Sequence, residues 1–161
     1  MNEVGHVTTS STEQQPADSP DGDGPAPQIE LRIPATATQL HVARTVAGDL
    51  AMREDFDLDA IDDLRLAVDE ACAMLVGRAT DGEPLICTFA VRNSAITISA
   101  QVRSETDGQP SASGLGSSAS GLGWRVLATL TDKATCDVSS APNGGHLVRI
   151  TLTKAKGGVI G

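Results

Sequence analysis

The stretch LRLAVDEACAMLV, residues 64–76, sets the carboxylate of Glu70 among small apolar residues. Met74 follows four residues later, and residues four apart share one face of a helix. We therefore expect Glu70, Met74 and Leu66 to project together at the edge of a pocket. A carboxylate there can orient or deprotonate a hydroxyl group or a water molecule. A solvated charge on the shoulder of a helix is the alternative interpretation of Glu70.

A second candidate is GLGW, residues 121–124, which comes directly before helical apolar spacing. Backbone N–H groups and the positive dipole end at a helix start can bind a phosphate group. A single GxG pattern is weak, however, and a hinge with a helix cap also explains Gly121 and Gly123. Gly145, before the last apolar run, is most simply part of a hairpin turn.

Several other kinds of site are not supported. His6, His41 and His146 lack the spacing of metal ligands, and no cysteine–histidine zinc pattern occurs. The sequence also has no G-x-S-x-G elbow, no P-loop and no dinucleotide fingerprint. The catalytic interpretation therefore depends on Glu70.

The cysteines favour a reducing environment. Cys72, Cys87 and Cys136 are widely spaced and odd in number, which does not indicate a disulfide framework. Free cysteines are often buried as small hydrophobic residues, and we expect this of all three. A redox role stays open as the alternative.

Length and charge limit the class of protein. A chain of 161 residues forms one domain with a real core. The net charge of −9 argues against direct nucleic-acid binding. No signal peptide or membrane-spanning run is visible, so we predict a cytoplasmic protein with no membrane partner.

Apolar periodicity divides the chain into elements. We expect residues 1–27 to be a disordered acidic tail, 28–156 the folded domain with a flexible lid at 103–120, and 157–161 a flexible end. Within the domain, the pattern predicts strands at 28–34, 85–92, 95–102, 135–141 and 146–154, and helices within 35–54, from about 57 to 77, and from 121.

This order predicts an α/β fold, a two-layer sandwich of helices on a mixed, mostly antiparallel sheet. Thr36 or Thr38 is expected to cap the first helix, and Asp57 or Asp59 the second. The second helix has a predicted apolar stripe that would face the sheet, made of Leu58, Ile61, Leu64, Val68, Ala71, Cys72 and Leu75.

The phrase DDLRLAVDEACAMLV, residues 62–76, resembles the N-box helix of RsbW/SpoIIAB-type anti-sigma factors, which are GHKL (histidine-kinase-like, Bergerat-fold) ATPases. QIELRIPA, residues 28–35, resembles their first strand, and residues 120–153 resemble their C-terminal third. The similarity covers about residues 28–156 and is greatest to the mycobacterial and actinobacterial branch.

The resemblance implies a homodimer that binds an alternative sigma factor, takes part in stress-response transcription, and is opposed by an anti-anti-sigma (STAS) protein. Many relatives use ATP and Mg²⁺ to phosphorylate a serine of that antagonist. The resemblance makes Glu70 the candidate general base and places Gly121, Gly123 and Gly145 at the nucleotide. Arg44, otherwise a solvated charge, falls where relatives have an arginine near the partner surface.

Two departures separate this chain from the family's kinases. Met74 stands where they have the asparagine whose oxygen holds Mg²⁺, and a thioether is a poor ligand for that hard cation. The adenine-binding D-x-G-x-G box is reduced to Asp107-Gly108. These departures favour a sigma-binding protein with degenerate nucleotide binding over the alternative, an ATP-dependent serine kinase. An interaction module for other partners is a third hypothesis.

Overall fold

The computed structural model describes residues 27–107 and 120–157. For residues 120 and 121 it describes the backbone alone. The elements in chain order are β1 (Gln28–Pro34), the 3-10 turn η2 (Ala37–Gln39), α1 (Leu40–Arg53), α2 (Leu58–Val76), β2 (Pro84–Arg92), β3 (Ala95–Ser104), α3 (Ser120–Leu130), β4 (Lys133–Ser140) and β5 (His146–Ala155). All of the expected tail except Pro27, most of the expected lid, and all of the expected flexible end except Gly157 lie outside the described ranges. The first two residues of that lid belong to β3.

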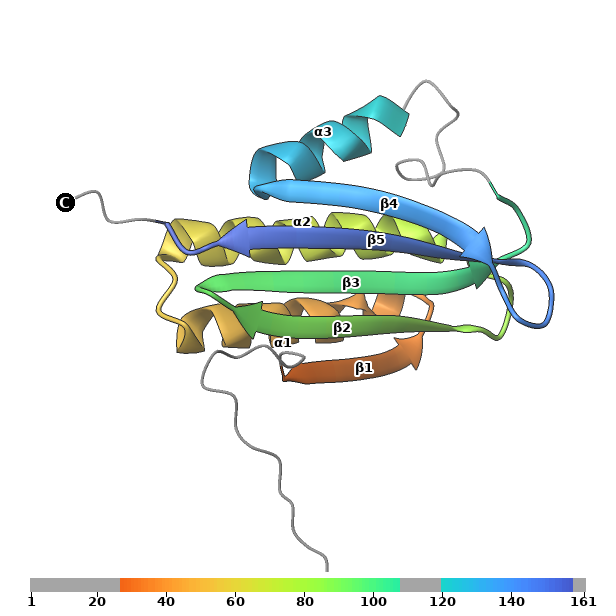
Figure 1. Ribbon diagram of the computed structural model, residues 1–161, viewed down its shortest axis with the longest axis horizontal. Helices are drawn as coiled ribbons and strands as arrows, with labels where there is room; N and C mark the ends of the chain where they lie inside the picture. Colours follow the sequence, from red (N-terminus) through yellow and green to blue (C-terminus); the bar gives the residue numbers. More distant parts are fainter. Residues whose placement is uncertain (1–26, 108–119, 158–161) are drawn as a thin grey trace, which may run out of the picture.

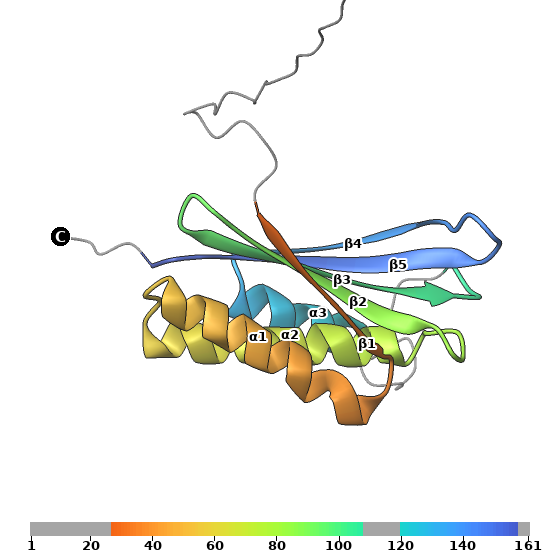
Figure 2. The ribbon, with the colours of Figure 1, turned by 90° about the horizontal axis from the view of Figure 1, so that it is seen from below.

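The strands form one sheet in the order β1-β2-β3-β5-β4. Every described pairing in it is antiparallel, rather than mixed. Helices α1, α2 and α3 all cover the same face of this sheet (Figures 1 and 2). The predicted two-layer α/β sandwich is therefore confirmed. Within the described residues, no helix combines the length and apolarity that a membrane crossing needs.

The core lies between the helices and the covered face of the sheet. In β3 the alternate residues Ile96, Ile98, Ala100 and Val102 are buried, and the residues between them are half-buried on the open face. This period-two burial is what a strand with one covered face requires. The turn before β3 has positive φ at Asn93 (54°) and Ser94 (62°), as a two-residue hairpin requires, so the predicted hairpin is confirmed.

The two helix starts differ from each other. Asp57 caps α2, because its Oδ1 accepts a hydrogen bond from the Ala60 backbone N–H at 2.8 Å. The prediction that a threonine caps α1 is wrong: that helix begins after Gln39, which makes no side-chain cap. Thr36 stands before the 3-10 turn and Thr38 within it, so neither occupies the N-cap of α1. Their hydroxyls lie 3.3 Å apart and bond to each other.

The apolar stripe of α2 is confirmed except at its first member. Leu58, the first residue of α2, is 78% exposed. The other six members of the stripe are buried: Ile61, Leu64, Val68, Ala71, Cys72 and Leu75.

Replacing the cap tests this account of α2. We expect Asp57→Ala to lower the free energy of unfolding by about 1 kcal/mol, because the Ala60 N–H loses its acceptor. Asp57→Asn keeps a side-chain oxygen and is expected to keep most of that stability. Urea unfolding of both variants measures the difference, and equal losses would show that the hydrogen bond is not the cause.

Candidate functional site

A cleft of about 650 Å³ lies where α1, α2 and α3 meet. On α2 it is lined by Leu66, Asp69, Glu70 and Ala73, on the side of the helix away from the buried stripe. The apolar part of the wall also includes residues of α1 and α3: Leu40, Val126 and Leu130. The cleft is thus an apolar groove with charged groups at one side.

The charged side of the cleft centres on an ion pair between two helices. Arg44 of α1 donates from Nη1 to Oδ2 of Asp69 on α2 at 2.9 Å. Both side chains are partly exposed, so solvent screening makes the pair worth little to stability. Glu70 lies next to Asp69, is half-buried, and has no ion pair within the described part of the chain. The cleft therefore holds one carboxylate that Arg44 does not neutralise.

Met74 does not share this cleft with Glu70. Its side chain is only 1% exposed and belongs to the hydrophobic core. A step of four residues turns a helix about 40° beyond a full turn. The row from Leu66 through Glu70 to Met74 therefore winds from an exposed position to a buried one. The expectation that these three residues project together is wrong for Met74.

The candidate glycines lie elsewhere. Gly123 is buried in the first turn of α3, which begins at Ser120, so the predicted helix start is confirmed. The surroundings of Gly121 lie outside the described part of the structure. Of the described candidates, Met74, Gly123 and Gly145 are all absent from the lining of the cleft.

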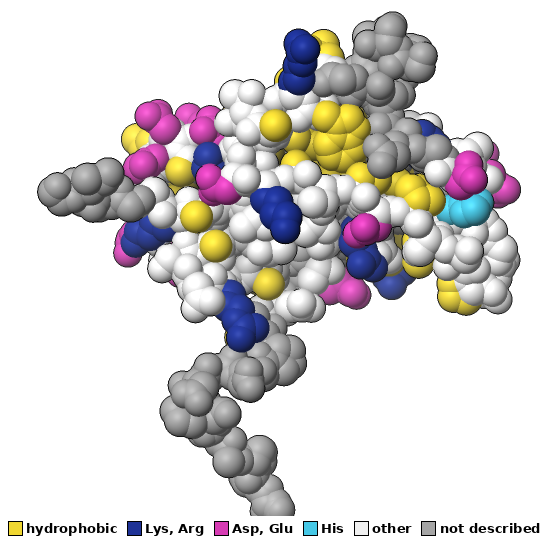
Figure 3. Space-filling view, turned by 45° about the horizontal axis from the view of Figure 1, so that its top comes forward, with side chains coloured by type: hydrophobic (Ala, Val, Ile, Leu, Met, Phe, Trp, Pro, Cys, Tyr) yellow, Lys and Arg dark blue, Asp and Glu magenta, His cyan; other side chains and the backbone are white. Residues whose placement is uncertain are grey.

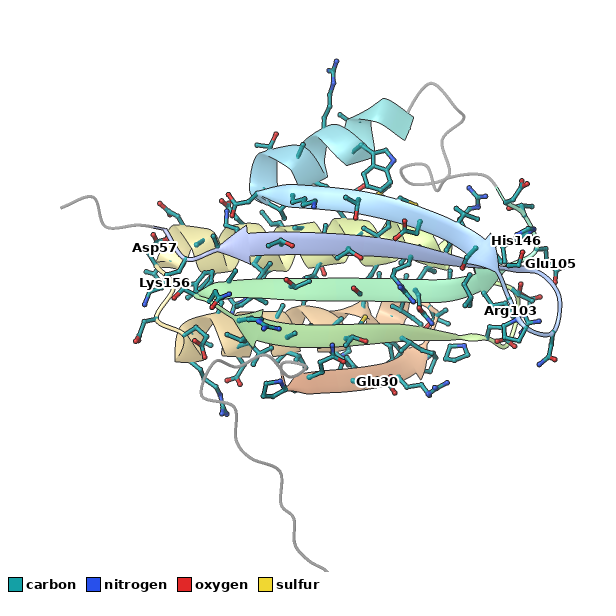
Figure 4. All side chains as sticks on the ribbon, viewed as in Figure 1. Glu30, Asp57, Arg103, Glu105, His146 and Lys156 are labelled. Carbon is teal, nitrogen blue, oxygen red and sulfur yellow. The ribbon has the colours of Figure 1, made fainter. Side chains whose placement is uncertain are left out.

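Gly145 is part of the turn between β4 and β5. Its φ is +73°, and a Cβ there would lie 3.0 Å from the carbonyl oxygen of Ser104. The hairpin interpretation of Gly145 is therefore confirmed. Arg103 donates a hydrogen bond to the Gly144 carbonyl of the same turn. Figure 4 shows Arg103, Glu105 and His146 at this end of the sheet, opposite Asp57 and Lys156.

Residue spacing in the sequence did not predict two sets of contacts that build the site. Asp69 pairs with Arg44 across 25 residues, and no spacing rule relates such positions. Lys154 on β5 donates from Nζ to the Leu130 carbonyl at 2.9 Å and lies 3.4 Å from Asp63 Oδ2. This lysine joins the end of α3 to α2 and so fixes one wall of the cleft.

Apolar side chains also gather at the surface between α3 and β4 (Figure 3). Half-buried members of the core in these two elements include Trp124, Leu130, Ala134, Cys136 and Val138. The expectation that every cysteine is buried holds for Cys72 and Cys87 and fails for Cys136, because β4 is the edge strand of the sheet.

Residues 33–152 match the histidine kinase-like ATPase domain. The chain belongs to this family. A relative from the curated proteins, the anti-sigma-F factor RsbW of Mycobacterium tuberculosis (strains CDC 1551 / Oshkosh and ATCC 25618 / H37Rv), is 30% identical over 131 residues. That match covers 78% of this chain and 71% of the relative. The resemblance to RsbW-type anti-sigma factors is thus confirmed as homology.

Two further matches are more limited. The serine-protein kinase RsbW of Bacillus cereus (strain AH187) is 36% identical over 52 residues, which is 32% of each chain. A chain in the solved SiaB–SiaC complex from Pseudomonas aeruginosa superposes with a TM-score of 0.59 at 11% identity, covering 78% of this chain and 89% of that chain. At this identity, the superposition shows the fold alone.

The burial of Met74 predicts how an asparagine would behave there. We expect Met74→Asn to lower the free energy of unfolding by about 3 kcal/mol, because apolar contacts are lost and an amide is buried. Met74→Leu preserves volume and should cost less than about 1.5 kcal/mol. Chemical denaturation measures both, and a fully stable Met74→Asn protein would contradict the core position of this residue.

Proposed function

We propose that this chain is an anti-sigma factor that binds an alternative RNA polymerase sigma factor and releases it to an anti-anti-sigma (STAS) protein. Homology to RsbW-type anti-sigma factors supports the class of partner. A homodimer and a place in a stress response belong to the same proposal, and the family resemblance supports both.

The observation that carries the proposal is the cleft between the three helices. An apolar groove with a charged rim is typical of a surface that binds another protein. Leu66, at its wall, is 55% exposed and adds apolar surface that a bound partner would cover. Arg44 stands at the same cleft, at the position that the family resemblance relates to partner contacts.

The residues at the expected nucleotide position do not fit ATP with Mg²⁺. Mg²⁺ needs oxygen ligands in near-octahedral geometry, whereas Met74 offers a buried thioether. Glu70 faces the cleft between the helices, and neither Gly123 nor Gly145 lines that cleft. We therefore derive no phosphoryl-transfer step, and sigma binding independent of nucleotide is the function that the site supports best.

A binding experiment tests this function. The full chain is titrated by calorimetry with each alternative sigma factor of the source organism, and we expect submicromolar affinity for one of them. Arg44→Ala should weaken that affinity about tenfold or more, because Arg44 stands at the proposed interface.

Arg53→Ala is the matched control. Arg53 also belongs to α1 and also pairs with an acid, Asp49, but it does not line the cleft. We expect the Arg53→Ala variant to bind the sigma factor with the same affinity as the unchanged protein. Failure of every sigma factor to bind would refute the proposed function, and equal losses in both variants would refute the location of the interface.

A further inference from the structure

Two buried thiols meet between the layers of the fold. Cys72 on α2 is 1% exposed and Cys87 on β2 is fully buried. Cys87 lies on the covered face of the sheet, between Leu85 and Phe89, where it points toward the helices. Each thiol is the side-chain hydrogen-bond partner of the other, so the two sulfur atoms lie within hydrogen-bond reach. Neither thiol has a role in the proposed function.

The contact makes the two sulfurs chemically different. The hydrogen bond to Cys87, together with burial, raises the pKa of Cys72 well above its ordinary value. The same hydrogen bond lowers the pKa of Cys87, because Cys72 donates to its sulfur, although burial acts in the opposite direction. Cys87 therefore has the greater thiolate character, and the thiolate is the nucleophile in thiol oxidation.

We propose that Cys72 and Cys87 are an oxidation site at which a small peroxide forms a disulfide that joins α2 to β2. The Cys87 thiolate attacks one peroxide oxygen, so that an S–O bond forms, the O–O bond breaks and hydroxide leaves. The Cys72 sulfur then attacks the Cys87 sulfenic acid, so that the S–S bond forms and a second hydroxide leaves. The two thiol protons convert both hydroxides to water, and a dithiol reductant reverses the step.

The position of the pair explains which oxidants fit. Closed burial excludes bulky reagents, whereas a small peroxide can enter during local opening of the packed layers. Closing the bond brings the sulfurs to about 2.05 Å and so ties α2 covalently to β2. Cys72 lies within three residues of Asp69 and Glu70, so the disulfide would tether α2 close to the residues that line the cleft.

Cys136 is the internal reference for the proposal. It is a free, half-buried thiol on β4, and burial followed by the nearby Asp137 carboxylate raises its pKa, although Arg78 lowers it. Within the described residues it has no hydrogen-bonded thiol partner comparable to that of Cys87. A peroxide is therefore expected to leave Cys136 without an intramolecular cross-link.

Peptide mapping tests the proposal, because trypsin separates the three cysteines. Cleavage after Arg65, Arg78 and Arg92 places Cys72 in peptide 66–78 and Cys87 in peptide 79–92. The folded full chain is treated with hydrogen peroxide, quenched, denatured, alkylated and digested without reductant. We expect a linked pair of these two peptides, lighter by two hydrogen atoms than their sum, which dithiothreitol separates. The Cys136 peptide should carry an alkyl label.

Two variants make the outcome decisive. Cys136→Ser should still form the linked pair, and Cys87→Ser should abolish it. Alkyl labels on both peptides 66–78 and 79–92 after peroxide would overturn the proposal. A link from Cys136 to either thiol, or a sulfinic acid at Cys87 without a cross-link, would overturn it as well. None of these readouts depends on sigma-factor binding, so the proposed function and this site can fail separately.

Discussion

Helix α2 is packed along the middle of the covered sheet face, and this packing determines the position of every candidate residue on it. The helix contacts α1 on one side and α3 on the other, and β2, β3 and β5 beneath it. Burial of residues such as Leu64, Val68 and Leu75 fixes its rotation about its own axis. At roughly 25 cal/mol per Å² of apolar surface removed from water, that burial outweighs any preference of a single polar side chain.

The rotation of α2 separates two residues that the sequence places one turn apart. It leaves Glu70 in the cleft shared with Arg44 and carries Met74 into the core. A thioether is well suited to that buried position, since it is apolar and fills irregular gaps. In this histidine kinase-like ATPase fold, α2 therefore keeps charged residues on its outer surface while its inner side is filled by hydrophobic packing.

Most of the fold could be predicted from the sequence because periodic burial is a local signal. The strands with one covered face and the apolar stripe of α2 follow directly from the spacing of apolar residues. The capping role of Asp57 follows from its position just before that stripe. Leu58 was misplaced because its exposure depends on where the neighbouring elements end. The predicted cap at Thr36 or Thr38 was wrong because a 3-10 turn, which the spacing did not reveal, moves the start of α1 to Leu40.

The candidate site was less predictable, because its contacts join distant parts of the chain. The pair of Arg44 with Asp69 and the contact of Cys72 with Cys87 both depend on how α2 packs against another element. A four-residue spacing indicates neighbours on a helix but not how deeply each one is buried. The inner position of Met74 therefore could not be derived from its distance to Glu70 in the sequence.

The most direct measurement is a calorimetric titration of the purified chain with Mg-ATP, beside the Met74→Asn variant. If Met74 closes the nucleotide position, the native chain gives no binding heat at concentrations where a functional kinase would be saturated. Micromolar binding by the native chain would contradict the account and make the serine kinase the better description. Binding by Met74→Asn alone would identify this one side chain as the group that abolishes nucleotide binding.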